Sequence, residues 1–250
     1  KNKKNLYFVT TIKEAVKNAD FIQECAPENE NLKKKLIKKI ESHCRKKIII
    51  SSSSSGLLPS KIQSLCKNPE RIIIGHPFNP VYLLPLVEIV PGNKTKKKYI
   101  DIASNFYLSI SMTPLILKKE IPGYLSDRLQ EAMWRESLHI VNEGIATTED
   151  LDNAIINGPG LRWSLMGTFL TFHLAGGKNG MEHMLKQFGP ALKLPWTKLK
   201  APKLTKRLSK NIINGTKKQS KGKSIAKITN IRDDYLVTLI KMKKKYQKKL

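Results

Sequence analysis

Short apolar runs alternate with longer polar segments over the first 120 residues, and this alternation constrains the fold more than any other feature. The runs are rich in Ile, Val, Phe and Tyr and fall at residues 6–10, 21–25, 47–50, 71–75, 86–90 and 113–117. Most lack a polar face, which is typical of strands covered by helices on both sides. Between two of them, one helical face is formed by Leu32, Leu36, Ile37 and Ile40. The pattern predicts an open parallel α/β sheet.

The pattern changes from Pro122 onward, where strand signals become rare. Residues 126–144 carry an apolar helical stripe that stops at Gly144, a suitable residue just past a helix end. Residues 147–158 begin with threonines and acidic side chains, which are typical of a helix N-terminus. We therefore expect an α/β domain over residues 1–119 and an all-helical domain over residues 120–250.

The formal net charge of +26 raises the possibility of a nucleic-acid partner. Only seven of the 46 basic residues are arginine, however, and the lysines are spread along the whole chain. Readers of phosphates and bases usually depend on the planar fork of arginine. We expect solvated lysines and no nucleic-acid partner, with attraction of polyanions by the basic tail at 241–250 as the alternative.

Other classes of protein are disfavoured by what the sequence lacks. No apolar stretch reaches the roughly 18 residues of a membrane-spanning helix, and the N-terminal residues do not have the pattern of a signal peptide. The three cysteines have spacings that match no metal motif: Cys25, Cys44 and Cys66. We expect reduced thiols in a cytoplasmic protein, without a metal site or a membrane partner.

Five consecutive serines at 51–55 could form either a flexible linker or a polar turn at a strand end. The choice depends on His76, which follows the run 71–75 at the edge where open α/β sheets place ligands. Glu88 comes twelve residues later inside an apolar run, and a carboxylate in such surroundings needs a partner. A neighbouring imidazole would be held in one tautomer and stabilised when protonated. Asn79 offers a hydrogen-bond donor to the same space, although a packed histidine and a solvent-facing glutamate remain the alternative.

Four segments resemble the 3-hydroxyacyl-CoA dehydrogenase superfamily: "SSSSSGLLP" at 51–59, "GHPFNPVYLLPLVEIV" at 75–90, "PGYLSDRL" at 122–129 and "EGIATTEDLDNAIINGPG" at 143–160. The resemblance implies NAD as the cofactor and a His76–Glu88 dyad that takes the hydroxyl proton of the substrate. It also implies that Ser55 contacts the substrate, that Asn79 helps to hold the reacting oxygen, and that Glu28 lies beside the nicotinamide. The serines are then a substrate-side turn.

Two further segments, 160–177 and 187–199, resemble the branch of the superfamily that oxidises L-carnitine, which is therefore the expected substrate. Arg162 suits a free carboxylate, and Trp163 is a candidate wall for a quaternary ammonium group. Asp127 replaces an asparagine of the acyl-CoA members and is expected to attract that cation. Oxidation of another small 3-hydroxy acid, such as a sugar acid, is one alternative, and a non-catalytic, crystallin-like relative is another.

The resemblance also implies a first βαβ unit, but no G-x-G-x-x-G follows any predicted strand. We therefore expect a partial Rossmann-type sheet that lacks its first two strands, with residues 6–10 as the third. We interpret the chain as a fragment of a longer protein. The helical half is expected to form a homodimer, as it does in the superfamily.

Overall fold

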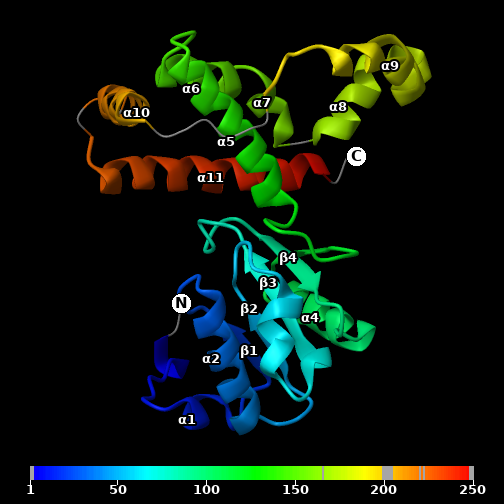
Figure 1. The fold of residues 1–250 in the computed structure, drawn as a ribbon, viewed down its shortest axis with the longest axis vertical. Helices are drawn as coiled ribbons and strands as arrows, with labels where there is room; N and C mark the ends of the chain where they lie inside the picture. Colours follow the sequence, from blue (N-terminus) through cyan, green and yellow to red (C-terminus); the bar gives the residue numbers. More distant parts are fainter. Residues whose placement is uncertain (1–2, 165, 199–204, 220, 222, 248–250) are drawn as a thin grey trace. The chain divides into compact units, whose positions relative to one another are not determined.

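The computed structural model describes residues 3–164, 166–198, 205–219, 221 and 223–247. The chain divides into two compact units, Lys1–Gln130 and Glu131–Leu250. The first unit contains a five-stranded sheet whose strands follow one another in chain order (Figure 1). The strands are β1 (Phe21–Glu24), β2 (Ile49–Ser52), β3 (Ile72–Pro77), β4 (Leu86–Pro91) and β5 (Thr113–Ile116). Five of the six predicted strands are thus present, within a few residues of their expected positions.

The sheet is mostly parallel, but one pair of strands departs from the expected pattern. Strands β1, β2 and β3 are parallel, β4 runs antiparallel to β3, and β5 is parallel to β4. Only the short segment 78–85 joins β3 to β4, whereas a parallel connection needs a crossover of a dozen or more residues. The antiparallel register pairs His76 directly with Glu88.

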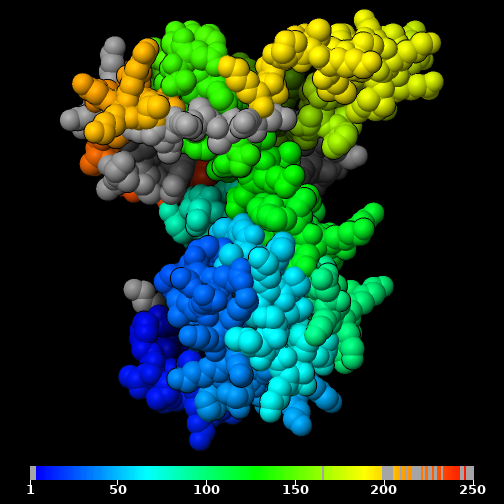
Figure 2. Space-filling model, in the orientation of Figure 1, coloured from blue at the N-terminus to red at the C-terminus, as the bar shows by residue number. Residues whose placement is uncertain are grey.

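Helices cover both faces of the sheet, as the continuous apolar strands predict. One face packs against α1 (Ile12–Val16), α2 (Glu30–His43) and α3 (Pro59–Ile62), and the other against α4 (Lys97–Ser109). Successive residues of β3 alternate between these cores: Ile72 and Ile74 lie in the first, and Ile73 lies in the second. The outer side of α2, drawn in blue, forms part of the surface of the first unit in Figure 2. Three short 3₁₀ turns complete the unit: η1 (Lys3–Asn5), η2 (Gln63–Leu65) and η3 (Pro69–Arg71).

The predicted strand at residues 6–10 is wrong. These residues form no strand, and the side chains of Leu6, Tyr7 and Phe8 are exposed to solvent. A strand is stable only when its backbone groups pair with a neighbour, and no described strand pairs with residues 6–10. The apolar composition alone therefore does not make this segment part of the sheet.

The second unit contains helices only within the described residues (Figure 1). They are the greater part of α5 (Ser126–Asn142), then α6 (Thr148–Ile156), α7 (Pro159–Trp163), α8 (Thr168–Ala175), η4 (Gly177–Asn179), α9 (Gly180–Phe188), η5 (Gly189–Lys193), α10 (Lys206–Gln219) and α11 (Ile225–Gln247). The predicted helix ends are confirmed: Gly144 has φ +71°, and Thr147 forms a reciprocal capping box with Asp150. Each helix in the described ranges is too short or too polar to cross a lipid bilayer.

Candidate active site

A buried histidine and a buried glutamate face each other across the antiparallel pair β3–β4. The Nδ1 atom of His76 lies 3.1 Å from Oε2 of Glu88. His76 is 5% exposed and Glu88 is completely buried. The pairing follows directly from strand register, because residues opposite each other on neighbouring strands point to the same face. The predicted dyad therefore exists as a hydrogen-bonded pair.

The second oxygen of Glu88 is held by the start of helix α5. Oε1 accepts hydrogen bonds from the backbone N–H groups of Leu125 and Ser126, both at 3.0 Å, and from Oγ of Ser126 at 3.2 Å. Burial would raise the pKa of Glu88, but the hydrogen bonds from His76, Ser126 and Leu125 outweigh it and lower the pKa. Glu88 is therefore an oriented, ionised carboxylate.

A second carboxylate approaches the opposite nitrogen of the same imidazole. Oδ2 of Asp127 lies 3.7 Å from Nε2 of His76, and the Asp127 side chain is 34% exposed. Partial burial and the nearby Glu88 raise the pKa of Asp127, while His76 opposes this shift. The imidazole thus lies between two carboxylates, one beside each ring nitrogen.

Aromatic rings complete the surroundings of the imidazole. The centroids of the Tyr124 and Phe78 rings lie 5.5 Å and 5.9 Å from that of His76. Tyr124 is fully buried, and its hydroxyl donates to the backbone oxygen of Leu57 at 2.8 Å. Its neighbour Gly123 lies next to Gly56, so the segment leading into α5 also touches the turn that follows the serines.

The serine run is a structured turn. Ser51 and Ser52 end strand β2 and are buried. Oε1 of Glu28 accepts hydrogen bonds from Oγ of Ser54 and from the backbone N–H groups of Ser55 and Gly56, the last two at 3.0 and 3.2 Å. One carboxylate therefore caps the whole turn. Ser55, the predicted substrate contact, is exposed.

A buried ion pair lies under this turn. Nζ of Lys33 is 3.0 Å from Oε1 and 3.1 Å from Oε2 of Glu24, and both side chains are 1% exposed. Oγ of Ser52 donates to the same carboxylate, and Lys33 also lies 3.8 Å from Oε2 of Glu28. One lysine thus balances two carboxylates, one buried beside β2 and one capping the serines.

Among the described residues, the structure gives none of the other predicted site residues a hydrogen bond to the dyad. Asn79 is exposed and follows the end of β3. Arg162 and Trp163 are exposed residues of the short helix α7 in the second unit. The roles of all three toward a substrate stay predictions.

Sequence reasoning missed the groups that support the dyad and the turn. Ser126 and the amides at the start of α5 carry no signal in a sequence, because their donors come from helix geometry. Lys33 was not singled out because it is one of several lysines in α2. Its position four residues before Ile37, on the apolar face of the helix, could have indicated that it is buried. No group of three or more His, Cys, Asp or Glu in the described part of the chain has the arrangement of a metal site.

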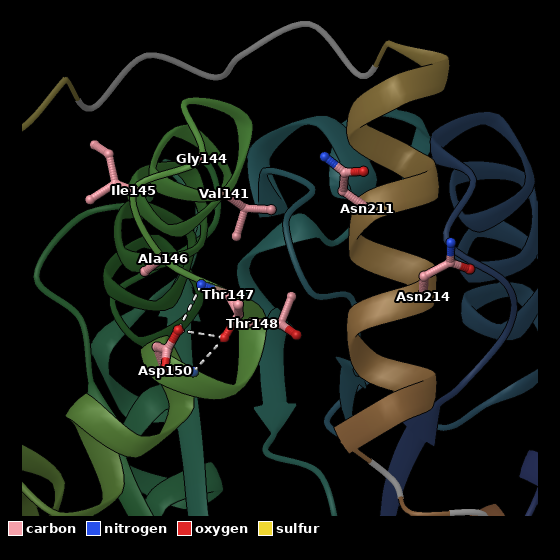
Figure 3. Close-up of a pocket in the computed structure, with 9 residues that line it drawn as sticks. All are labelled: Val141, Gly144, Ile145, Ala146, Thr147, Thr148, Asp150, Asn211 and Asn214. Atoms are coloured by element: carbon pink, nitrogen blue, oxygen red, sulfur yellow. Dashed lines mark hydrogen bonds between the residues drawn. The ribbon is translucent and has the colours of Figure 1, made fainter.

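The second unit contains a separate cavity of about 410 Å³ between the 141–150 segment and helix α10 (Figure 3). Its acidic group, Asp150, is occupied by hydrogen bonds within the capping box with Thr147, which Figure 3 draws as dashed lines. Asn211 and Asn214 line the opposite side. The described residues that line this cavity leave no general base free for chemistry, so we assign it no catalytic role.

Comparisons with known proteins identify the family of the chain. Residues 1–121 match the sequence model of the 3-hydroxyacyl-CoA dehydrogenase NAD-binding domain, and residues 123–224 match that of the C-terminal domain. The chain is 52% identical over 245 residues to an L-carnitine dehydrogenase of Bacillus cereus, covering 98% of this chain and 75% of that one. It is 54% identical over 235 residues to an L-carnitine dehydrogenase of Pseudomonas putida, covering 94% and 73%.

Solved structures carry the same fold. A 5-formyl-3-hydroxy-2-methylpyridine 4-carboxylic acid 5-dehydrogenase aligns over 96% of this chain and 77% of its own, with a TM-score of 0.76 and 22% identity. The (S)-3-hydroxybutyryl-CoA dehydrogenase of Ralstonia eutropha aligns over 72% and 63%, with a TM-score of 0.56 and 26% identity. Both domain models together span almost the whole chain, which therefore belongs to the 3-hydroxyacyl-CoA dehydrogenase family.

Proposed function

We propose that the protein oxidises the 3-hydroxyl group of L-carnitine to a ketone with NAD. The observation that carries the proposal is the buried His76–Glu88 pair, 3.1 Å apart at the carboxyl edge of the sheet, in a chain 52–54% identical to L-carnitine dehydrogenases. An alcohol oxidation needs a base for the hydroxyl proton, and this pair supplies one.

The proton transfer follows from the positions of the two dyad residues. Glu88 accepts a hydrogen bond from the Nδ1–H group of His76. The unprotonated Nε2 is then the basic nitrogen that receives the proton of the substrate. The imidazolium that forms is balanced by Glu88 on one side and by Asp127 on the other. Ser55 and Asn79 would hold the substrate oxygen while it becomes a carbonyl.

We place the cofactor at the carboxyl edge of the sheet, where β1 leads to Glu28 and β2 leads into the serine turn. In an open α/β sheet, ligands bind beyond the carboxyl ends of the strands. At this edge the backbone N–H of Ser55 donates to the Glu28 carboxylate, and both residues are exposed to solvent. These residues would lie beside the nicotinamide ring. NAD, when bound, supplies the acceptor for the hydride that leaves the carbon.

Selectivity for carnitine would come from its two charges. Arg162 could pair with the carboxylate through two parallel hydrogen bonds, and Trp163 could cover the trimethylammonium group. Asp127, partly exposed beside His76, adds a negative charge that attracts the same cation. A 3-hydroxy acid without a cationic group would gain nothing from Asp127 or Trp163.

We further propose a cytoplasmic homodimer whose two domains divide the chain near residue 120. The three cysteines are free thiols, as expected in a reducing compartment.

Several large apolar side chains of segment 168–196, drawn in yellow-green and yellow in Figure 2, are exposed, including Phe169, Leu192 and Trp196. An apolar surface of this kind is typical of a subunit interface.

The test is a comparison of substrates. The protein is assayed for NADH formation with L-carnitine, with 3-hydroxybutyrate, which has the same carboxylate and hydroxyl but no cation, and with gulonate as the sugar acid. Turnover of carnitine with kcat/KM at least tenfold above the others supports the proposal. Preference for either acid that lacks a cationic group, or no turnover together with unchanged NADH fluorescence on mixing, contradicts it.

A further inference from the structure

Tyr124 occupies an unusual position between the dyad and the serine turn. Its backbone has φ +45°, a left-handed conformation that bulky residues rarely adopt. Such backbone strain is retained where the surroundings fix it, and it is common at functional sites. The side chain is fully buried, so Tyr124 is not an open wall for a ligand.

The two ends of this side chain contact two different parts of the site. The ring lies 5.5 Å from the imidazole of His76, centroid to centroid. The hydroxyl donates to the backbone oxygen of Leu57 at 2.8 Å. Leu57 directly follows Gly56, whose N–H is held by Glu28. Tyr124 therefore connects the base to the capped turn through a single rigid ring.

The hydroxyl is held in its neutral, donating form. Burial raises the pKa of Tyr124, a hydrogen bond with the Ser54 side chain partly opposes this shift, and the nearby carboxylates of Glu28, Glu88 and Asp127 add to it. Because its pKa is raised above the ordinary value of 10.0, the phenol is neutral near pH 7 and donates to the Leu57 carbonyl. The hydrogen bond between the Tyr124 hydroxyl and the turn is therefore made by the neutral phenol.

We propose that Tyr124 is a positioning residue that fixes the serine turn relative to the His76–Glu88 dyad. The consequence for chemistry rests on the proposed function, in which His76 takes the proton and Ser55 holds the same oxygen. Both groups must then meet one substrate atom, and small displacements of such groups reduce the rate strongly. The aromatic ring sets the spacing, and the hydroxyl prevents the turn from moving away.

Tyr124→Phe is the most informative variant because it keeps the ring and removes only the oxygen. Loss of one buried hydrogen bond is expected to speed amide exchange of residues 53–58 about fivefold. The exchange of β3, residues 72–77, should stay unchanged. This measurement by mass spectrometry needs no substrate, so it is independent of whether carnitine is turned over. In an active protein, kcat/KM for carnitine should fall about tenfold.

Tyr107→Phe is the matched control. The Tyr107 hydroxyl is also buried and hydrogen-bonded, to Gln23 and Ser51, but it lies in the core on the other face of the sheet. This variant should not speed exchange of residues 53–58. Unchanged exchange of the turn in Tyr124→Phe, equal acceleration in the control, or acceleration that extends to β3 would each overturn the proposal, the last because it indicates global loosening. Accelerated exchange without any carnitine turnover would support the positioning role and contradict only the proposed function.

Discussion

His76 and Asp127 approach each other to 3.7 Å between Nε2 and Oδ2, on the side of the imidazole that Glu88 does not use. The histidine therefore has a fully buried carboxylate on Nδ1 and a partly exposed one beside Nε2. The first is fixed by three donors from the start of α5. The second is open to a ligand, so the two carboxylates are suited to different tasks.

Glu88→Gln should abolish base catalysis without disturbing the fold. The amide oxygen can still accept from Leu125 and Ser126, but the amide nitrogen then donates to Nδ1 of His76. That reversal places the imidazole proton on Nε2, so this nitrogen can no longer accept the proton of the substrate. We expect kcat to fall about 10²–10⁴-fold. Steady-state NADH formation at saturating carnitine and NAD measures the effect.

Asp101→Asn, an exposed change on α4, is the control for loss of one negative charge. It should leave kcat within about twofold of the unmodified protein. Circular dichroism must show both variants folded. A Glu88→Gln protein with nearly normal kcat would mean that His76 is not the base.

Asp127→Asn should reduce the preference for a cationic substrate. The variant loses the charge that attracts the trimethylammonium group but keeps the size of the side chain. Loss of the Asp127 charge also removes stabilisation of the His76 imidazolium, which lowers kcat for every substrate alike. The ratio of kcat/KM for carnitine to that for 3-hydroxybutyrate therefore reports only the preference for the cationic substrate. We expect this ratio to fall about tenfold, or ~1.4 kcal/mol. An unchanged ratio would remove Asp127 from substrate selection.

Much of the site was predictable because strand ends and register follow local rules. The apolar runs 47–50 and 71–75 lie within or beside strands β2 and β3. His76 and Glu88, twelve residues apart in sequence, are direct cross-strand partners in the structure. Residues 6–10 were misassigned because a strand depends on a neighbour, which composition does not reveal. The supports of the site, including Ser126 and Lys33, were missed because they come from elements distant in sequence, and only packing brings them together.

The buried Glu41 carboxylate should make the free energy of unfolding decrease at acidic pH. Burial alone would raise its pKa, but hydrogen bonds from the backbone N–H groups of Lys67 and Asn68, at 2.8 and 2.6 Å, contribute to a net lowering. Because the folded pKa lies below the ordinary value of 4.5, the unfolded chain binds more protons in this range. The stabilisation is therefore fully present above about pH 4.5 and is lost as the pH falls through the folded pKa.

The measurement is urea unfolding followed by backbone circular dichroism for the unmodified protein and Glu41→Gln. The difference in midpoint should be largest at neutral pH and shrink below about pH 4.5. All three tryptophans belong to the second unit, at Trp134, Trp163 and Trp196. Their fluorescence therefore provides an internal control and should report the same transition in both proteins. A midpoint difference that is constant with pH would contradict the role of the ionised carboxylate.

Substitutions in the Lys33–Glu24 pair should have non-additive effects on the free energy of unfolding. Lys33→Met leaves the Glu24 carboxylate buried without its cation, which should cost about 3–5 kcal/mol of unfolding free energy. Glu24→Gln/Lys33→Met removes both charges, while the glutamine oxygen can still accept from Ser52. This double variant should recover most of the loss, because a buried pair gains little over neutral groups of similar shape. Urea unfolding of the two variants gives the comparison. A double variant as unstable as Lys33→Met would mean that the lysine acts through packing of its stem and its bond to the Ala26 carbonyl, and not through charge.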